Sequence, residues 1–352
     1  MRAVLPPIGC NGRGAQASSM KVPVSLVEAP VEEQFRLVHD SGLFDSFDRL
    51  PMPGQLDTFI RCIERYGLPV KTASWFYALG RDEALLSTKL KLAAEVGALQ
   101  HNMMVYWHDG HGRPVTDEEV AEFYLRAYDE GMARNVEPTL ELHVNMWSED
   151  PRRVVPVAEA VRRRGVPFNF TLDYSHVIFK IGNAQELAIC GLADDVAAGR
   201  TVLDPFQPGN LLDQWLDMDI VRWLQVRSVA PNGPRNIWSC SDSSQAVAAV
   251  PEHSIFPYRA GEPGRGILYP FTQPAPGAWH SAWDDGALDM TREVVRKVLA
   301  RHLRQGADSP LRAITTEMIN LPDYAHNARF SLIDENAAIA RHVRDTWQSM
   351  IA

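Results

Sequence analysis

The sequence predicts a single α/β domain of the (β/α)8 TIM-barrel class, with a long insertion between the seventh and eighth strands. Two observations support this fold. Strand-like and helix-like segments alternate from residue 21 to the end of the chain, and they provide eight strand candidates. No GxGxxG motif follows the first strand candidate, as it would in many open nucleotide-binding sheets.

Short runs of apolar and β-branched residues predict the strands. These runs lie at residues 22–27, 43–50, 70–78, 102–107, 139–144, 168–174, 220–229 and 311–319. Apolar residues at helical spacing predict helices at 31–42, 55–67, 83–98, 117–135, 152–165, 184–199, 289–306 and 333–350. Thr116 precedes one of these helices and Glu119 follows three residues later, which predicts a capping box.

Two segments do not fit the alternation of strands and helices. Residues 1–20 are rich in Gly, Pro and Ser, so we expect a loosely ordered extension before one barrel domain at 21–352. Residues 230–285 are rich in Pro, Gly, Ser and Trp, and they would lie in a loop at the catalytic face of the barrel. We expect this insertion to be a lid or a substrate wall, and the alternative is an arm for packing or oligomerisation.

The composition indicates a soluble globular protein, with 352 residues, 45% hydrophobic and 22% charged. The net charge of −9 disfavours nucleic acid as a partner, and no apolar run is long enough to span a membrane. The four cysteines are scattered without a CxxC motif, which favours reduced thiols in the cytoplasm. A homodimer is compatible with this composition.

Three carboxylates lie at or near the ends of predicted strands: Glu141, Asp173 and Glu317. The carboxyl ends of barrel strands face one cavity, so we expect these side chains to converge. Burying unpaired carboxylates together is costly, and a divalent cation such as Mn, Mg, Co or Zn would neutralise them. Each residue taken alone is more often an ion-paired strand end or a turn cap.

The order and spacing of these residues resemble the xylose isomerase-like TIM-barrel superfamily over residues 21–352. This group includes sugar isomerases, ketose 3-epimerases, dehydratases and an apurinic endonuclease. Glu141, Asp173 and Glu317 match the superfamily's acidic metal ligands, and His176 matches a His three residues after the Asp. The resemblance implies that Glu141 and Glu317 are ligands and catalytic bases. It also implies that His176 binds a substrate oxygen.

The seventh strand departs from the pattern of the superfamily, because it lacks the ligand His. Gln225 is the expected fourth metal ligand in its place, and Arg227 beside it would favour an anionic substrate. A His from the insertion, His280 or His253, is an alternative ligand. After the fifth strand, Trp147 stands where ketose epimerases place a substrate-binding Glu.

Three more residues are candidates for substrate binding. His143 follows Glu141 on the fifth strand, and it could equally belong to the ion-paired end of that strand. Trp107 and His108 lie where the fourth strand meets its loop. Barrel packing and a solvated loop are the alternative roles of Trp107 and His108.

The function predicted from these features is a divalent-metal-dependent isomerase or epimerase of a sugar or a related polyhydroxy carbonyl compound. The enzyme would abstract a proton next to the carbonyl group. A lyase or dehydratase with the same first step is one alternative. A non-catalytic sugar-binding barrel with a decayed metal site is the other, and the missing His supports it. The negative charge disfavours the endonuclease.

Overall fold

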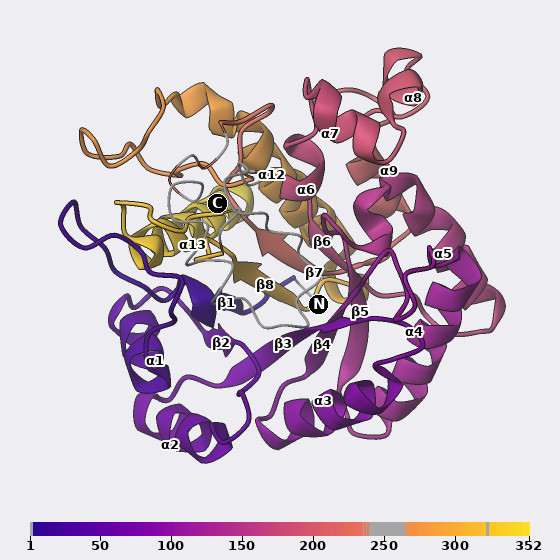
Figure 1. The fold of residues 1–352 in the computed structure, drawn as a ribbon, viewed down its shortest axis with the longest axis horizontal. Helices are drawn as coiled ribbons and strands as arrows, with labels where there is room; N and C mark the ends of the chain where they lie inside the picture. Colours follow the sequence, from indigo (N-terminus) through magenta and orange to yellow (C-terminus); the bar gives the residue numbers. More distant parts are fainter. Residues whose placement is uncertain (1–2, 235, 237, 239–264, 266, 322–323) are drawn as a thin grey trace.

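Eight parallel strands close into a barrel in chain order, with β1 beside β8 (Figure 1). The computed structural model describes residues 3–234, 236, 238, 265, 267–321 and 324–352. The strands are β1 (Ile8–Asn11), β2 (Ser46–Asp48), β3 (Val70–Tyr77), β4 (Gln100–Val105), β5 (Glu137–Glu141), β6 (Phe170–Asp173), β7 (Val221–Val226) and β8 (Ala313–Thr316). The predicted (β/α)8 barrel class is therefore confirmed.

Helices follow the strands and surround the barrel (Figure 1). They are α1 (Val31–Asp40), α2 (Leu56–Tyr66), α3 (Glu83–Glu95), α4 (Asp117–Met132), α5 (Val154–Arg163), α6 (Ser175–Ile178), α7 (Ala184–Ile189), α8 (Ala193–Ala197), α9 (Leu211–Asp217), α12 (Asp289–Gln305) and α13 (Leu332–Ile351). The predicted capping box at the start of α4 is confirmed. In the part of the chain that the structure describes, no helix is long and apolar enough to cross a bilayer.

The first strand lies in the segment that we expected to be a loose extension, so that expectation is wrong. β1 pairs in parallel with both β2 and β8, and it closes the barrel. A Cβ atom on Gly9 would lie 2.9 Å from Ser46 Oγ and 3.1 Å from Thr315 Cγ2, so the strand needs a residue without a side chain there. A short strand that contains glycine and no run of β-branched residues shows no strand pattern in the sequence.

The segment at 22–27, predicted as the first strand, does not form a strand. Its apolar residues do not share a buried face, because Val24 is buried whereas Val22 and Val27 are 65% and 73% exposed. Val24 instead exchanges backbone hydrogen bonds with the loop after β8, donating to Ala328 and accepting from Asn327.

The two faces of β2 show how the strands divide their side chains. Phe47 points outward and stacks on Phe35 of α1, with ring centroids 4.0 Å apart. Phe59 of α2 completes this aromatic cluster between the barrel and its helices. Because side chains alternate along a strand, Ser46 and Asp48 face the barrel interior.

The barrel interior is polar near its carboxyl end, where branched apolar side chains commonly fill such barrels. Thr139 of β5 and Thr171 of β6 share a hydrogen bond of 2.6 Å. Trp223 Nε1 of β7 donates to Thr315 Oγ1 of β8 at 2.8 Å. These cross-strand bonds fix the strands directly beneath the residues that end them.

The described ends of the insertion pack against the barrel. Arg265 forms ion pairs with Glu149, which ends the 3-10 helix η2 (Trp147–Glu149), and with Glu186 of α7. Lys180 Nζ lies 2.8 Å from Glu149 Oε1 in the same buried network. Residues 239–264 lie outside the described chain, so the role of the insertion as a lid stays a prediction.

Removal of residues 1–19 should prevent folding, because β1 supplies hydrogen bonds to two neighbouring strands and closes the barrel. We expect the truncated chain to be insoluble or to lack a cooperative thermal transition by circular dichroism. A chain that lacks only residues 1 and 2 is the matched control and should melt like the full chain. Equal melting of both truncations would contradict the assignment of β1.

Candidate active site

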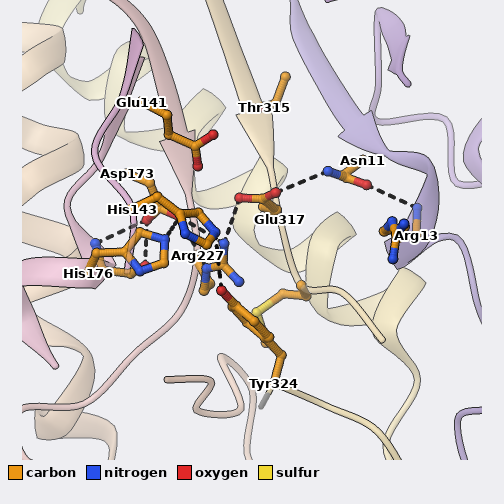
Figure 2. Close-up of polar contacts among 12 residues, drawn as sticks. Asn11, Arg13, Glu141, His143, Asp173, His176, Arg227, Thr315, Glu317 and Tyr324 are labelled. Atoms are coloured by element: carbon orange, nitrogen blue, oxygen red, sulfur yellow. Dashed lines mark hydrogen bonds and ion pairs between the residues drawn. The ribbon is translucent and has the colours of Figure 1, made fainter. Parts of the chain in front are cut away.

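Three carboxylates meet at the carboxyl end of the barrel, as the sequence predicted. Glu141 ends β5, Asp173 ends β6 and Glu317 directly follows β8. One oxygen from each lies within 4.8 Å of the other two. Figure 2 shows these side chains turned toward one another, with Arg227 beneath them.

Arg227, one residue past β7, forms ion pairs with two of the three carboxylates. Its Nη2 atom lies 2.9 Å from Asp173 Oδ2 and 2.8 Å from Glu317 Oε2, and its Nε donates to Asp173 Oδ2 at 3.1 Å. The guanidinium group also stacks on the ring of Tyr324, with Cζ 4.1 Å from the ring centroid. The side chain is fully buried, so these contacts define the electrostatics of the site.

Asp173 is the carboxylate that stays ionised. Ser175 donates to its Oδ1 through both the backbone nitrogen and the hydroxyl, at 3.1 Å and 2.5 Å. Burial opposes the charge, but Arg227 and His176 together hold the pKa of Asp173 well below its usual range. Asp173 and Arg227 therefore form a permanent ion pair.

The pKa of Glu141 is shifted in the opposite direction from that of Asp173. Burial raises the pKa of Glu141 well above its ordinary value, and the charges of Glu317 and Asp173 raise it further. Asn102 of β4 donates to Glu141 Oε2. Among the described residues, no group hydrogen-bonds to Glu141 Oε1. The direction of this shift favours the protonated form of Glu141.

The pKa of Glu317 lies between that of Asp173 and that of Glu141. Burial raises its pKa to about 8, with Arg227 opposing the rise and the charges of Asp173 and Asp48 adding to it. Asn11 of β1 donates from Nδ2 to Glu317 Oε1 at 3.1 Å. Glu317 can thus gain or lose a proton near physiological pH.

Two histidines border the carboxylates, at the positions that the sequence predicted. The rings of His143 and His176 lie 4.2 Å apart. Burial lowers the pKa of His176 to about 4 and that of His143 well below its usual value, so both rings are neutral. His176 Nδ1 accepts from the Val144 backbone at 3.4 Å, and His176 Nε2 lies 3.3 Å from Asp173 Oδ2. Tyr324 OH lies 3.3 Å from His143 Nε2.

Gln225 lies deeper in the barrel than Arg227, with which it shares the inward face of β7. It pairs in register with Asp173 and Thr315, and its Oε1 atom accepts no hydrogen bond from the described residues. Among the described residues, Arg227 donates hydrogen bonds to Asp173 and Glu317, and no such bond comes from Gln225.

The remaining candidates lie in loops. Trp107 packs edge-on against His108, with ring centroids 5.6 Å apart, and His108 is exposed. Among the described residues, no hydrogen bond or ring contact joins either of them to the carboxylates. His280 stacks on Trp279, and His253 lies outside the described residues.

A divalent metal suits the oxygen chemistry of this cluster but does not fit beside Arg227. Glu141, Asp173 and Glu317 are close enough to share an ion. However, one oxygen of Asp173 and one of Glu317 already accept Arg227 Nη2. An ion bound to these oxygens would lie within about 5 Å of the guanidinium, where like charges repel by several kcal/mol even at an intermediate dielectric. At Asp173 and Glu317 the residues as arranged therefore hold a guanidinium group. Glu141 also lies with His143 and His176 in a second group whose ligand atoms are within 4.8 Å of one another, and Arg227 donates no hydrogen bond to this group.

Sequence reasoning missed several residues that shape the site. Asn102, Asn11 and Asp48 face the interior from strands β4, β1 and β2. Asp48 is a polar residue near the end of a predicted strand, which is the feature that identified Glu141, whereas Asn102 is the first residue of its predicted strand. Asn11 could not be found in this way, because its strand was not recognised.

Solved structures match the chain over nearly its whole length, whereas no family model and no curated protein sequence matches it. A xylose isomerase domain-containing protein from Salmonella typhimurium is 15% identical, with 98% of this chain and 99% of that chain covered and a TM-score of 0.50. A xylose isomerase-like TIM-barrel protein from Mycobacterium smegmatis, in complex with magnesium, is 11% identical, with coverages of 97% and 98% and a TM-score of 0.52.

An L-ribulose 3-epimerase is also similar, at 12% identity, with coverages of 98% and 95% and a TM-score of 0.51. The chain therefore has the fold of xylose isomerase-like TIM barrels, as the resemblance predicted. Identities this low establish the fold alone, and the reaction must be argued from the site.

Asp48 should make the protein less stable as the pH rises. It is 2% exposed, neither of its oxygens accepts a hydrogen bond from the described residues, and burial raises its pKa to about 7. The folded protein therefore keeps a proton that the unfolded chain releases near pH 4, and this stabilisation is lost as the pH rises through 7. Relative to Asp48→Asn, the wild type should lose about 1 kcal/mol per pH unit between pH 4 and 7.

Urea unfolding of both proteins at pH 5, 6, 7 and 8 would measure this difference. Asp57→Asn, an equivalent change at an exposed position of α2, should show no such trend. A constant difference in free energy between the wild type and Asp48→Asn across this range would show that Asp48 is ionised throughout.

Proposed function

We propose that the protein is an isomerase or epimerase that moves a proton next to the carbonyl group of a small polyhydroxy compound. One observation carries this proposal. Two buried glutamates, Glu141 and Glu317, lie with oxygens within 4.8 Å, and their surroundings raise the two pKa values to different extents. A pair of carboxyl groups whose pKa values are separated supplies an acid and a base in one site.

Glu317 is the proposed base, because its pKa of about 8 allows a carboxylate to form in mildly alkaline solution. The carboxylate removes the proton from the carbon, and the electron pair of the C–H bond forms an enediol-type double bond while the carbonyl oxygen takes up the charge. Glu141, whose raised pKa favours the protonated form before the reaction, returns a proton to the same carbon in an epimerisation. In an isomerisation it protonates the former carbonyl carbon, while the proton of the neighbouring hydroxyl group moves to the former carbonyl oxygen. The two residues thereby exchange protonation states, and proton exchange with water restores the ionised Glu317 and the protonated Glu141 before the next turnover.

His143 and His176 are the proposed ligands of substrate hydroxyl groups. Both are neutral and buried beside the carboxylates, and a substrate hydroxyl group would exchange for one of their present partners, Tyr324 OH at His143 or Asp173 at His176. The L-ribulose 3-epimerase among the similar folds supports a sugar-like substrate. Trp107 and His108 remain candidates for contacts with the far end of a longer substrate.

The divalent metal expected from the sequence has no step in this proposal. Mn, Mg, Co or Zn bound by Glu141, Asp173, Gln225 and Glu317 would polarise the substrate carbonyl group. The contacts of Arg227 with Asp173 and Glu317 oppose such a site, so the proton transfers above are assigned to the protein's own residues.

Replacement of either glutamate by glutamine should abolish proton transfer. We expect Glu141→Gln and Glu317→Gln each to slow the reaction by at least about 10²-fold to 10⁴-fold, because each removes one proton-transfer group and keeps its shape. The assay is deuterium uptake from D₂O at the carbon next to the carbonyl group, followed by NMR over a panel of ketoses, aldoses and keto acids.

Glu118→Gln, the same chemical change on the exposed surface of α4, is the control and should leave the exchange rate unaltered. Exchange that persists at the wild-type rate in both site variants would contradict the assignment. A product that has lost water would indicate the alternative lyase reaction on the same site. The absence of any exchange or turnover over the panel would favour the non-catalytic sugar-binding barrel.

The reaction rate should rise with pH. Because the pKa of Glu317 is raised, the residue is protonated and inactive as a base at low pH, and the active carboxylate accumulates as the pH approaches 8. We expect kcat/KM to increase about tenfold per pH unit below this pKa and to level off above it. A pH–rate profile from pH 6 to 10 measures this, and a plateau that begins below pH 6 would exclude Glu317 as the base.

A further inference from the structure

Arg227 stands at the point where the three carboxylates need a positive charge. Its Nη2 atom bridges Asp173 Oδ2 and Glu317 Oε2 at 2.9 Å and 2.8 Å. These oxygens belong to two of the three groups that could share a divalent ion. A fixed guanidinium and a metal ion therefore compete for the same ligands.

The surroundings of Arg227 hold it in this position. The side chain is fully buried, and Nε and Nη2 both donate to Asp173. Tyr324 covers the guanidinium face at 4.1 Å, and the backbone carbonyl of Tyr324 accepts from Asn236 Nδ2 at 3.0 Å. Figure 2 shows Arg227 enclosed between the carboxylates and Tyr324. Because Asp173, Glu317 and Tyr324 all contact the guanidinium group, it is ordered before any substrate binds.

One nitrogen of Arg227 is left without a partner among the described residues. Nη1 is buried and donates to none of them, although the other two nitrogens are fully engaged. A buried N–H donor without an acceptor is costly, so Nη1 needs a partner such as a bound water molecule or a ligand. Nη1 belongs to the guanidinium group that contacts Glu317, one of the two carboxyl residues assigned to proton transfer.

We propose that Arg227 takes the place of the divalent cation in this barrel, and that Nη1 binds the substrate oxygen that becomes negatively charged during proton transfer. The second part of this inference rests on the proposed function, whereas the first part, the exclusion of metal, does not. When the carboxylate of Glu317 takes the proton from carbon, the electron pair of the carbonyl π bond moves onto the oxygen. Arg227 donates a hydrogen bond to that oxygen and keeps its own protons, so the charge returns to carbon when Glu141 delivers a proton.

The test is the metal content of the folded protein after incubation with Mn²⁺, Co²⁺ or Zn²⁺ and removal of free ions, measured by elemental analysis. Wild type and Arg227→Lys should each retain less than about 0.1 ion per chain, because both keep a positive charge beside the carboxylates. Arg227→Met removes the charge and keeps most of the length of the side chain, so it should retain about one ion per chain. Arg227→Met combined with Asp173→Asn should lose that ion again.

If Arg227→Met does not fold, the metal content of the wild-type protein alone tests the exclusion of metal. A metal content near one ion per chain in wild type, removed by Asp173→Asn, would overturn it. A folded Arg227→Met protein that retains no ion would also overturn it, because the carboxylates would then not be a cation site. These measurements need no turnover, so a failure of the proposed proton transfer would be seen separately in the deuterium assay.

The second part is tested by chelation and by kinetics. Wild-type exchange should be unchanged after dialysis against EDTA, and Arg227→Lys should lower kcat more than it raises KM, because the contact strengthens as charge develops. Exchange that stops with EDTA and returns with an added cation would overturn the role of Arg227. An unaltered kcat in Arg227→Lys, with only KM raised, would also overturn it.

Discussion

The ion pairs of Arg227 with Asp173 and Glu317 are the interaction on which the site depends. Three carboxylates within 4.8 Å of one another cannot all be buried and ionised without a cation. Arg227 supplies one positive charge, and Asp173 takes it as a permanent partner. Glu317 shares the same guanidinium group but keeps a raised pKa, and Glu141 forms no ion pair with the described residues, so both glutamates can bind a proton.

The barrel supports this arrangement from several strands. Asn11, Asn102 and Ser175 each donate to a different carboxylate, and each lies on or just after a different strand. Beneath them, the Thr139–Thr171 and Trp223–Thr315 bonds join neighbouring strands inside the barrel. Groups held by strands keep their relative positions better than groups held by loops, so the geometry is set before substrate binds.

The sequence predicted most of the fold and part of the site. Seven of the eight strands lie where alternating or continuous apolar runs predicted them, because those strands bury side chains on both faces. β1 was not recognised, since its pairing with β2 and β8 requires Gly9 where a strand pattern requires a large apolar residue. Glu141, Asp173 and Glu317 were found because strand ends of a barrel converge, which is a property of the fold.

The role of Arg227 could not be predicted in the same way. The sequence places Gln225 and Arg227 on the same face of one strand, and the superfamily pattern favours Gln225 as the residue at the metal. Which of them reaches the carboxylates depends on the stagger of the strands and on the length of the side chain. The neutral state of His143 and His176 likewise depends on burial, which a sequence does not give.

A crystal structure of the wild-type protein grown with excess MnCl₂, with anomalous data collected at the manganese edge, tests the replacement of the metal by Arg227 most directly. We expect no anomalous peak among Glu141, Asp173 and Glu317, and Arg227 Nη2 within hydrogen-bond distance of both Asp173 and Glu317. A strong peak bound by these carboxylates, with Arg227 turned away from them, would contradict that replacement.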